Sequence, residues 1–121
     1  MEPAPSPESG RQVIERYGAA GFRVSGVFFA GPVLVLPDRT IPWPEPAATI
    51  DALAPAIARG GFELILIGLG RRGAPVGPAL RAALKACGIG VEAMDTGAAC
   101  RTYNLLVAED RRVAAALMLL V

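Results

Sequence analysis

Apolar and polar residues follow one another in short blocks that predict alternating strands and helices. Residues 63–67 contain a continuous apolar run, which is typical of a strand covered on both faces. Pro78 opens a helix that Gly88 ends, and residues 90–94 form the next strand. The buried side of this helix is predicted at helical spacing, at Leu80, Ala83, Leu84 and Cys87. Together these elements predict a strand–helix–strand unit with a right-handed crossover and parallel strands.

Shorter β-rich runs precede this unit and a longer helix follows it. We expect strands near residues 22–24, 27–29 and 33–36, and a short helix within residues 49–61 that Asp51 caps. A third helix is expected from Asp95-Thr96 to about Glu109. Its core-facing side is predicted to hold Ala99, Cys100, Tyr103, Leu106 and Val107. The alanines of residues 113–120 suit a helix, but their position after a polar turn favours a last buried strand.

Length and charge limit the classes of protein that this chain fits. A chain of 121 residues, 53% hydrophobic and 19% charged, is large enough for one domain with a real core. The net charge of +1 does not favour a nucleic-acid partner, and no apolar run is long enough to span a membrane. Residues 1–10 are acidic and rich in proline, which predicts a disordered lead-in to a domain over residues 11–121 and a cytoplasmic location.

The supply of catalytic and metal-binding side chains is small. Histidine, the commonest general base and metal ligand, is absent. The two cysteines, Cys87 and Cys100, do not have the spacing of a zinc site. We therefore expect no cofactor and no metal, and the sequence favours a protein without catalytic activity.

A candidate ligand site follows from the topology. If strands 63–67 and 90–94 are parallel neighbours, the loops after them, "GLGRRG" and "DTG", meet at one edge of the sheet, where ligands bind in open α/β folds. The helix that begins after this edge and nearby arginines favour an anion or a carboxylate. The predicted crevice comprises Gly68, Gly70, Arg71, Asp95, Thr96, Cys100, Arg101 and Asn104.

Most of these features also have a purely structural interpretation. The glycines at 68, 70 and 73 match the dinucleotide pattern G-x-G-x-x-G, but the helix begins several residues too late, which favours a tight turn. Asp95-Thr96 either caps the helix or presents polar groups to a ligand. Cys100 is either a buried small side chain or a thiol at a helix start. Asn104 either ties down a neighbouring segment or lines the crevice.

Several segments in this order resemble one protein family. They are "GFRVSG", "VLVLP", Trp43, "ELILIGLG", "GIGVEAMDT", "ACRTYNLL" and "AED…AAAL". The family is that of mitochondrial complex I (NADH:ubiquinone oxidoreductase) assembly factor three and its uncharacterised bacterial and archaeal homologues, domain of unknown function four-nine-eight. The resemblance implies that a family motif includes Asp95, Thr96, Ala99, Cys100, Thr102 and Asn104.

The resemblance also implies a fold and a kind of partner. We expect a compact α/β domain with a mixed, mostly parallel sheet, helices packed on it and an N-terminal β-hairpin element. Two functions are then open. The first is a non-catalytic binding or assembly module with protein partners, in respiratory-complex or membrane-protein biogenesis. The alternative is a small-molecule binding protein or enzyme that takes an anion in the predicted crevice.

Overall fold

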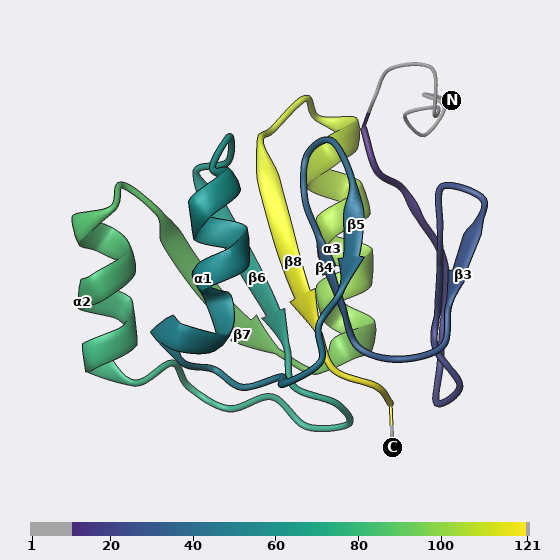
Figure 1. Ribbon diagram of the computed structural model, residues 1–121, viewed down its shortest axis with the longest axis horizontal. Helices are drawn as coiled ribbons and strands as arrows, with labels where there is room; N and C mark the ends of the chain where they lie inside the picture. The colour runs from purple at the N-terminus through teal and green to yellow at the C-terminus, as the bar shows by residue number, and fades with distance from the viewer. Residues whose placement is uncertain (1–10, 121) are drawn as a thin grey trace.

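The computed structural model describes residues 11–120, so the disorder predicted for residues 1–10 lies outside the described residues. Over these described residues the fold consists of two β-sheets and three helices (Figure 1). The strands are β1 (Ile14–Tyr17), β2 (Phe22–Val24), β3 (Val27–Phe29), β4 (Val33–Val35), β5 (Thr40–Pro42), β6 (Leu64–Gly68), β7 (Gly90–Met94) and β8 (Val113–Leu117). The helices are α1 (Ile50–Arg59), α2 (Pro78–Ala86) and α3 (Thr96–Ala108).

The main sheet has five strands in the order β5-β4-β8-β6-β7. Strands β7, β6 and β8 are parallel, as the strand–helix–strand unit predicted, and residues 113–117 form a strand rather than a helix. Strand β4 is antiparallel to both β5 and β8. Because the smaller sheet β1-β2-β3 is antiparallel throughout, four of the six strand pairings in residues 11–120 are antiparallel. The prediction of a mostly parallel sheet was therefore wrong.

The apolar segment 33–36 explains this difference. Val33, Leu34, Val35 and Leu36 are all buried, so the strand needs a cover on both faces and enters the main sheet between β5 and β8. The preceding strands β2 and β3 stay outside and pair with β1. The sequence did not predict β1, because Ile14 is its only buried residue and its other side chains show no alternation.

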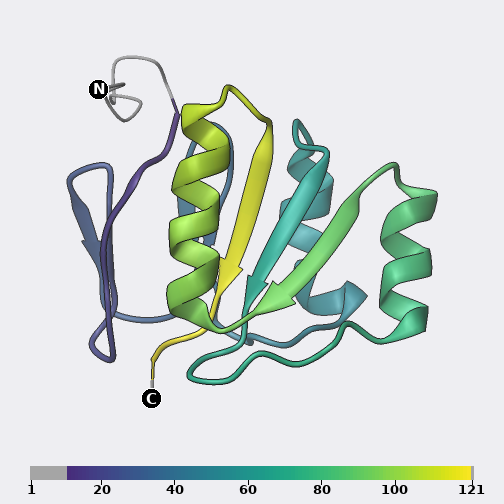
Figure 2. The same ribbon diagram turned by 180° about the vertical axis from the view of Figure 1, so that it is seen from behind.

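Helices cover both faces of the five-stranded sheet. Ile65 and Ile67 point to the side of α1 and α2, whereas Leu66 between them points to α3. The opposite views in Figures 1 and 2 show α1 on one side of the sheet and α3 on the other. Helix α3 also packs against β1, so it lies between the two sheets and joins them.

Two details of the shorter helices differ from the predictions. The cap of α1 is Thr49, whose hydroxyl accepts a hydrogen bond from the Ala52 N–H at 3.2 Å. The helix begins at Ile50, two residues earlier than a cap at Asp51 requires, and Asp51 lies in its first turn. In α2, Leu80 and Leu84 are buried, but Cys87 is an exposed free thiol, because the helix has already ended there.

Candidate functional site

The two loops of the predicted crevice are in direct contact. Both follow the carboxyl ends of parallel strands, β6 and β7, and reach the same edge of the sheet. The Leu69 N–H donates to the Met94 carbonyl at 2.9 Å, and the Thr96 N–H donates to the Gly70 carbonyl at 2.8 Å. The loops are therefore hydrogen-bonded neighbours.

Thr96 is the centre of this contact. Its side chain is fully buried, and its hydroxyl accepts from the Gly70 N–H at 2.9 Å and donates to the Met118 carbonyl at 2.7 Å. The Met118 N–H in turn donates to the Gly68 carbonyl at 2.9 Å. We call Gly68, Gly70, Thr96 and Met118 the Thr96 junction. It links the ends of β6 and β8 to the start of α3.

The glycines of the loop allow a close approach of backbone segments. A Cβ atom on Gly68 would lie 3.0 Å from the Cα atom of Thr96, and one on Gly73 would lie 2.9 Å from the Cα atom of Met94. Helix α2 begins only at Pro78. This packing gives the pattern of glycines at 68, 70 and 73 a structural role at the loop contact.

Asp95 and Cys100 are part of the folded framework. The Asp95 carboxylate accepts from the Ala98 N–H at 2.9 Å, which confirms the predicted helix cap. Cys100 is buried between α3 and the main sheet. Burial raises the pKa of its thiol to about 12, although the neighbouring Arg101 charge acts in the opposite direction. At neutral pH this thiol is protonated and shielded.

Arg101 and Asn104 face β1. The Asn104 side chain accepts from the Ile14 N–H at 3.0 Å and donates to the Ile14 carbonyl at 2.7 Å. The Arg101 guanidinium donates to the Tyr17 hydroxyl at 2.9 Å. Asn104 therefore ties down a neighbouring segment, as one of its two interpretations stated. Its partner could not be predicted because β1 has no clear sequence pattern.

Part of the predicted crevice borders an open hollow. This hollow of about 310 Å³ shares Gly70 and Arg71 with the predicted set. Its lining residues are Pro32, Pro46, Leu69, Gly70, Arg71, Met118 and Leu119. Among the predicted residues, Arg71 is thus a cation placed beside an apolar surface that a small molecule or a partner side chain can reach.

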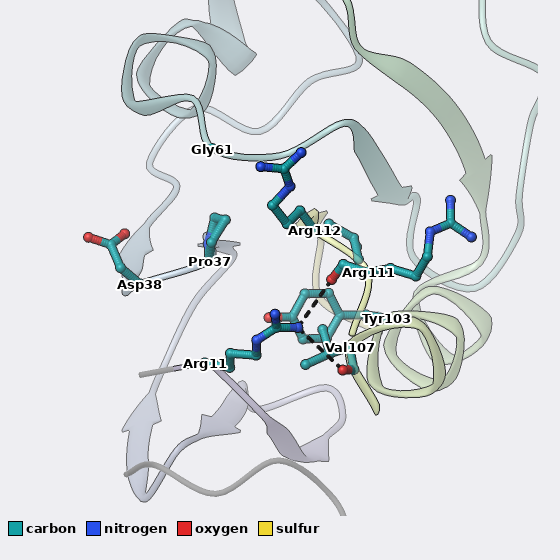
Figure 3. Close-up of a pocket in the computed structure, with 9 residues that line it drawn as sticks. Arg11, Pro37, Asp38, Gly61, Tyr103, Val107, Arg111 and Arg112 are labelled. Atoms are coloured by element: carbon teal, nitrogen blue, oxygen red, sulfur yellow. Dashed lines mark hydrogen bonds between the residues drawn. The ribbon is translucent and has the colours of Figure 1, made fainter. Parts of the chain in front are cut away.

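A second pocket, of about 220 Å³, lies at the opposite end of the main sheet, where β8 begins (Figure 3). Four separate segments form it, which is why the sequence pattern did not reveal it. The lining residues are Arg11, Pro37, Asp38, Gly61, Tyr103, Val107, Arg111, Arg112 and Val113. Apolar side chains and the Tyr103 ring contribute to its wall, with arginines beside them (Figure 3).

The charges of this second pocket have partners. Arg11 forms an ion pair with Asp110. Both Arg111 and Arg112 approach Glu63, at 3.4 Å and 4.0 Å between nitrogen and oxygen.

The remaining polar groups at this pocket are also engaged. Asp38 is directed away from the arginines (Figure 3) and pairs with Arg59 at 3.1 Å. The Tyr103 hydroxyl donates to the Gln12 carbonyl at 2.9 Å, and burial raises its pKa above the ordinary value. The second pocket thus combines an apolar wall with compensated charges.

The described residues hold neither a cluster of metal ligands nor a membrane-spanning helix. Within residues 11–120, His, Cys, Asp and Glu side chains do not form a group of three that could hold a metal ion. Over the same residues, none of the helices combines the length and the apolar character that crossing a membrane requires.

The chain is similar in sequence to known proteins over most of its length. The chain is 35% identical over 120 residues to an uncharacterised protein of Rhodobacter capsulatus, covering 98% of this chain and 93% of that protein. It is 32% identical over 114 residues to NADH dehydrogenase (ubiquinone) 1 alpha subcomplex assembly factor 3 of Xenopus tropicalis, covering 87% of this chain and 60% of that protein. The chain therefore spans less than two thirds of the length of this vertebrate relative.

A solved structure extends the similarity to three dimensions. The crystal structure of a Bordetella parapertussis protein superimposes with a TM-score of 0.80 at 38% identity, covering 96% of this chain and 98% of that one. Residues 14–118, from the start of β1 to just beyond β8, match one family model. The chain belongs to the family of proteins of unknown function DUF498/DUF598, whose homologues include the complex I assembly factor.

Proposed function

We propose that this protein is a non-catalytic protein-binding module that acts in the assembly of a respiratory or other membrane complex. Its similarity to assembly factor 3 extends over 87% of the chain. The family model matches residues 14–118, which include both described sheets and the three described helices. Because the vertebrate relative is longer, the shared part supports the binding module rather than every activity of that protein.

The use of the polar side chains is the observation that carries this proposal. The side chains of Thr96, Asn104 and Asp95 form hydrogen bonds with backbone groups of the same chain. The Cys100 thiol is buried. The exposed surface offers large apolar side chains instead. Those more than a third exposed are Tyr17, Val27, Phe28, Ile50 and Leu105. Such a distribution suits contact with another protein better than chemistry on a small substrate.

A crosslinking experiment in native cells tests the assembly role. A tagged chain, captured after mild crosslinking, is expected to enrich subunits of one membrane complex over an unrelated tagged protein of similar size. Deletion of the gene should lower the amount of that assembled complex on native gels. Failure to enrich any partner reproducibly, together with normal complex levels in the deletion strain, would contradict the proposal.

The hollow beside Arg71 favours a second candidate function, the binding of a small anion. Arg71 places a positive charge at an apolar wall that includes Leu69 and Met118. A thermal-shift series with phosphates, nucleotides and carboxylates tests it, since a ligand at one hundred times its dissociation constant stabilises a protein by about 2.7 kcal/mol. We expect Arg71→Ala to abolish a shift that Arg112→Ala, at the second pocket, preserves. The reverse pattern, or no shift with any compound, would exclude this site.

A further inference from the structure

We propose that the open edge of β3 binds an extended, acidic segment of a partner protein as an additional strand. The inference rests on the proposed protein-binding function and names the surface and the chemistry of the partner. The proposed binding surface consists of the backbone of β3 and three side chains on the outer face of the small sheet. These side chains, Arg16, Arg23 and Phe28, are called the outer patch.

The two edges of the small sheet differ. At the β1 edge, the Asn104 side chain forms hydrogen bonds with both the N–H and the carbonyl of Ile14. At the other edge, within residues 11–120, β3 pairs with β2 alone. Val27 and Phe28 on this edge are 56% and 54% exposed. An exposed apolar edge strand is a template for pairing with another chain, and natural proteins normally protect it with charge or proline.

The hairpin geometry shows which backbone groups of β3 are available. Ser25 and Gly26 form the two-residue turn, with φ angles of 47° and 85° that match the usual hairpin turn of this length. Val24 and Val27 flank the turn and exchange hydrogen bonds, so the next pair, Arg23 and Phe28, does not. The Phe28 N–H and carbonyl therefore face the open edge.

The outer patch indicates the charge of the partner. Arg16, Arg23 and Phe28 lie opposite one another across the three strands and line a shallow hollow of about 350 Å³. Like charges directly opposite each other on neighbouring strands destabilise a sheet. The nearest compensating group is Glu15, 3.7 Å from Arg23, and it also accepts from the Gly26 N–H at 2.7 Å. A further carboxylate above the two guanidinium groups would relieve this repulsion.

An added strand would bring such a carboxylate into range. Pairing at Phe28 places one side chain of the new strand beside the Phe28 ring on the outer face, about 10 Å, or two strand spacings, from the Cβ atom of Arg23. An extended Glu and an extended Arg side chain together span this distance. Backbone hydrogen bonds would supply affinity, and the acidic side chains would supply selectivity, as in other proteins that bind peptides by strand addition.

A peptide titration tests the charge and the edge separately. The probe is a fluorescein-labelled eight-residue peptide with alternating Glu and Val, compared with versions that carry Gln or Lys in place of Glu. We expect the acidic peptide to bind with a fluorescence anisotropy change that weakens as salt is added, and to bind roughly tenfold more tightly than the Lys peptide. Equal binding of the three peptides, or no binding of the acidic one up to millimolar concentration, would overturn the proposal.

Variants locate the binding surface. Arg16→Glu with Arg23→Glu should weaken binding of the acidic peptide roughly tenfold or more. The matched control is Arg39→Glu with Arg72→Glu, which makes the same change in net charge at exposed positions outside the outer patch and should bind the peptide like the natural chain, apart from a small general effect of charge. Phe28→Pro removes the open N–H but preserves the pairing of β3 with β2, and should abolish strand addition. Thermal unfolding verifies that each variant is folded.

The cellular experiment separates this inference from the broader proposal. If the Arg16→Glu, Arg23→Glu variant still captures the same subunits as the natural chain, the assembly role stands and the outer patch is wrong. If the natural chain captures none, the assembly role fails, whatever the peptide titration shows. If the natural chain captures the subunits and the Arg16→Glu, Arg23→Glu variant does not, the result supports both the assembly role and the outer patch.

Discussion

At the scale of single residues, Thr96 shows how a candidate ligand group serves the fold. Its hydroxyl satisfies two backbone groups, Gly70 N–H and Met118 carbonyl, in a fully buried position. Thr96→Val keeps the shape but leaves both groups unpaired, so we expect the free energy of unfolding in urea to fall by about 2–4 kcal/mol. Thr96→Ser retains the hydroxyl and should cost only about 1 kcal/mol. Equal losses in the two variants would contradict the role of the hydroxyl.

Cys100 and Cys87 give a comparison within one molecule. We expect a thiol reagent at neutral pH to label exposed Cys87 rapidly, and to label Cys100 only after denaturant is added. Rapid labelling of both in the folded protein would show that the Cys100 site opens easily. Peptide mapping after labelling distinguishes the two residues.

The raised pKa of Cys100 also predicts a loss of stability in alkali. Between the ordinary thiol value of 9.0 and about 12, the unfolded chain loses a proton that the folded chain retains, so the free energy of unfolding falls as pH rises through this window. One such group contributes at most about 1.4 kcal/mol per pH unit. Urea unfolding at a series of pH values should show a smaller slope for Cys100→Ala, while an unchanged slope would assign the effect to other groups such as Tyr103.

At the scale of elements, one amide side chain joins the small sheet to α3. Asn104 holds the N–H and the carbonyl of Ile14, and removal of its side chain leaves the start of β1 without these bonds. We expect Asn104→Ala to accelerate hydrogen exchange of the Ile14 amide roughly tenfold, with β6 amides little changed. Leu105→Ala, at a neighbouring residue that is 59% exposed, serves as the control. A uniform acceleration throughout the protein would mean that Asn104 supports the whole fold rather than this attachment.

At the scale of the whole molecule, the position of β8 predicts an all-or-none dependence. The strand lies between β4 and β6 and pairs with both. A chain that ends at Arg112 should therefore lack a cooperative thermal transition, because the main sheet is left in two parts. Addition of a synthetic peptide of residues 113–121 should restore the transition, monitored by circular dichroism. A cooperative transition without the peptide would contradict the central role of β8.

In the whole molecule, the sequence predicted the elements that depend on local patterns and missed those that depend on distant contacts. The apolar run of β6 and the helical periodicity of α3 are local patterns, so these elements were placed within a residue or two. The meeting of the 68–73 loop with Thr96 followed from the parallel unit. The antiparallel entry of β4, the attachment of β1 to Asn104 and the second pocket depend on contacts between segments distant along the chain. A hydrophobic pattern identifies which residues need a cover, but not which segment provides it.

The order of strands has a consequence for biosynthesis. A ribosome synthesises β4, β5, β6 and β7 before β8. The two halves of the main sheet, β5-β4 and β6-β7, are therefore complete before the strand that lies between them. During this interval the facing edges of β4 and β6, both apolar, are unprotected. Nascent chains of this protein should therefore depend on chaperones that shield such edges until translation of the final segment is complete.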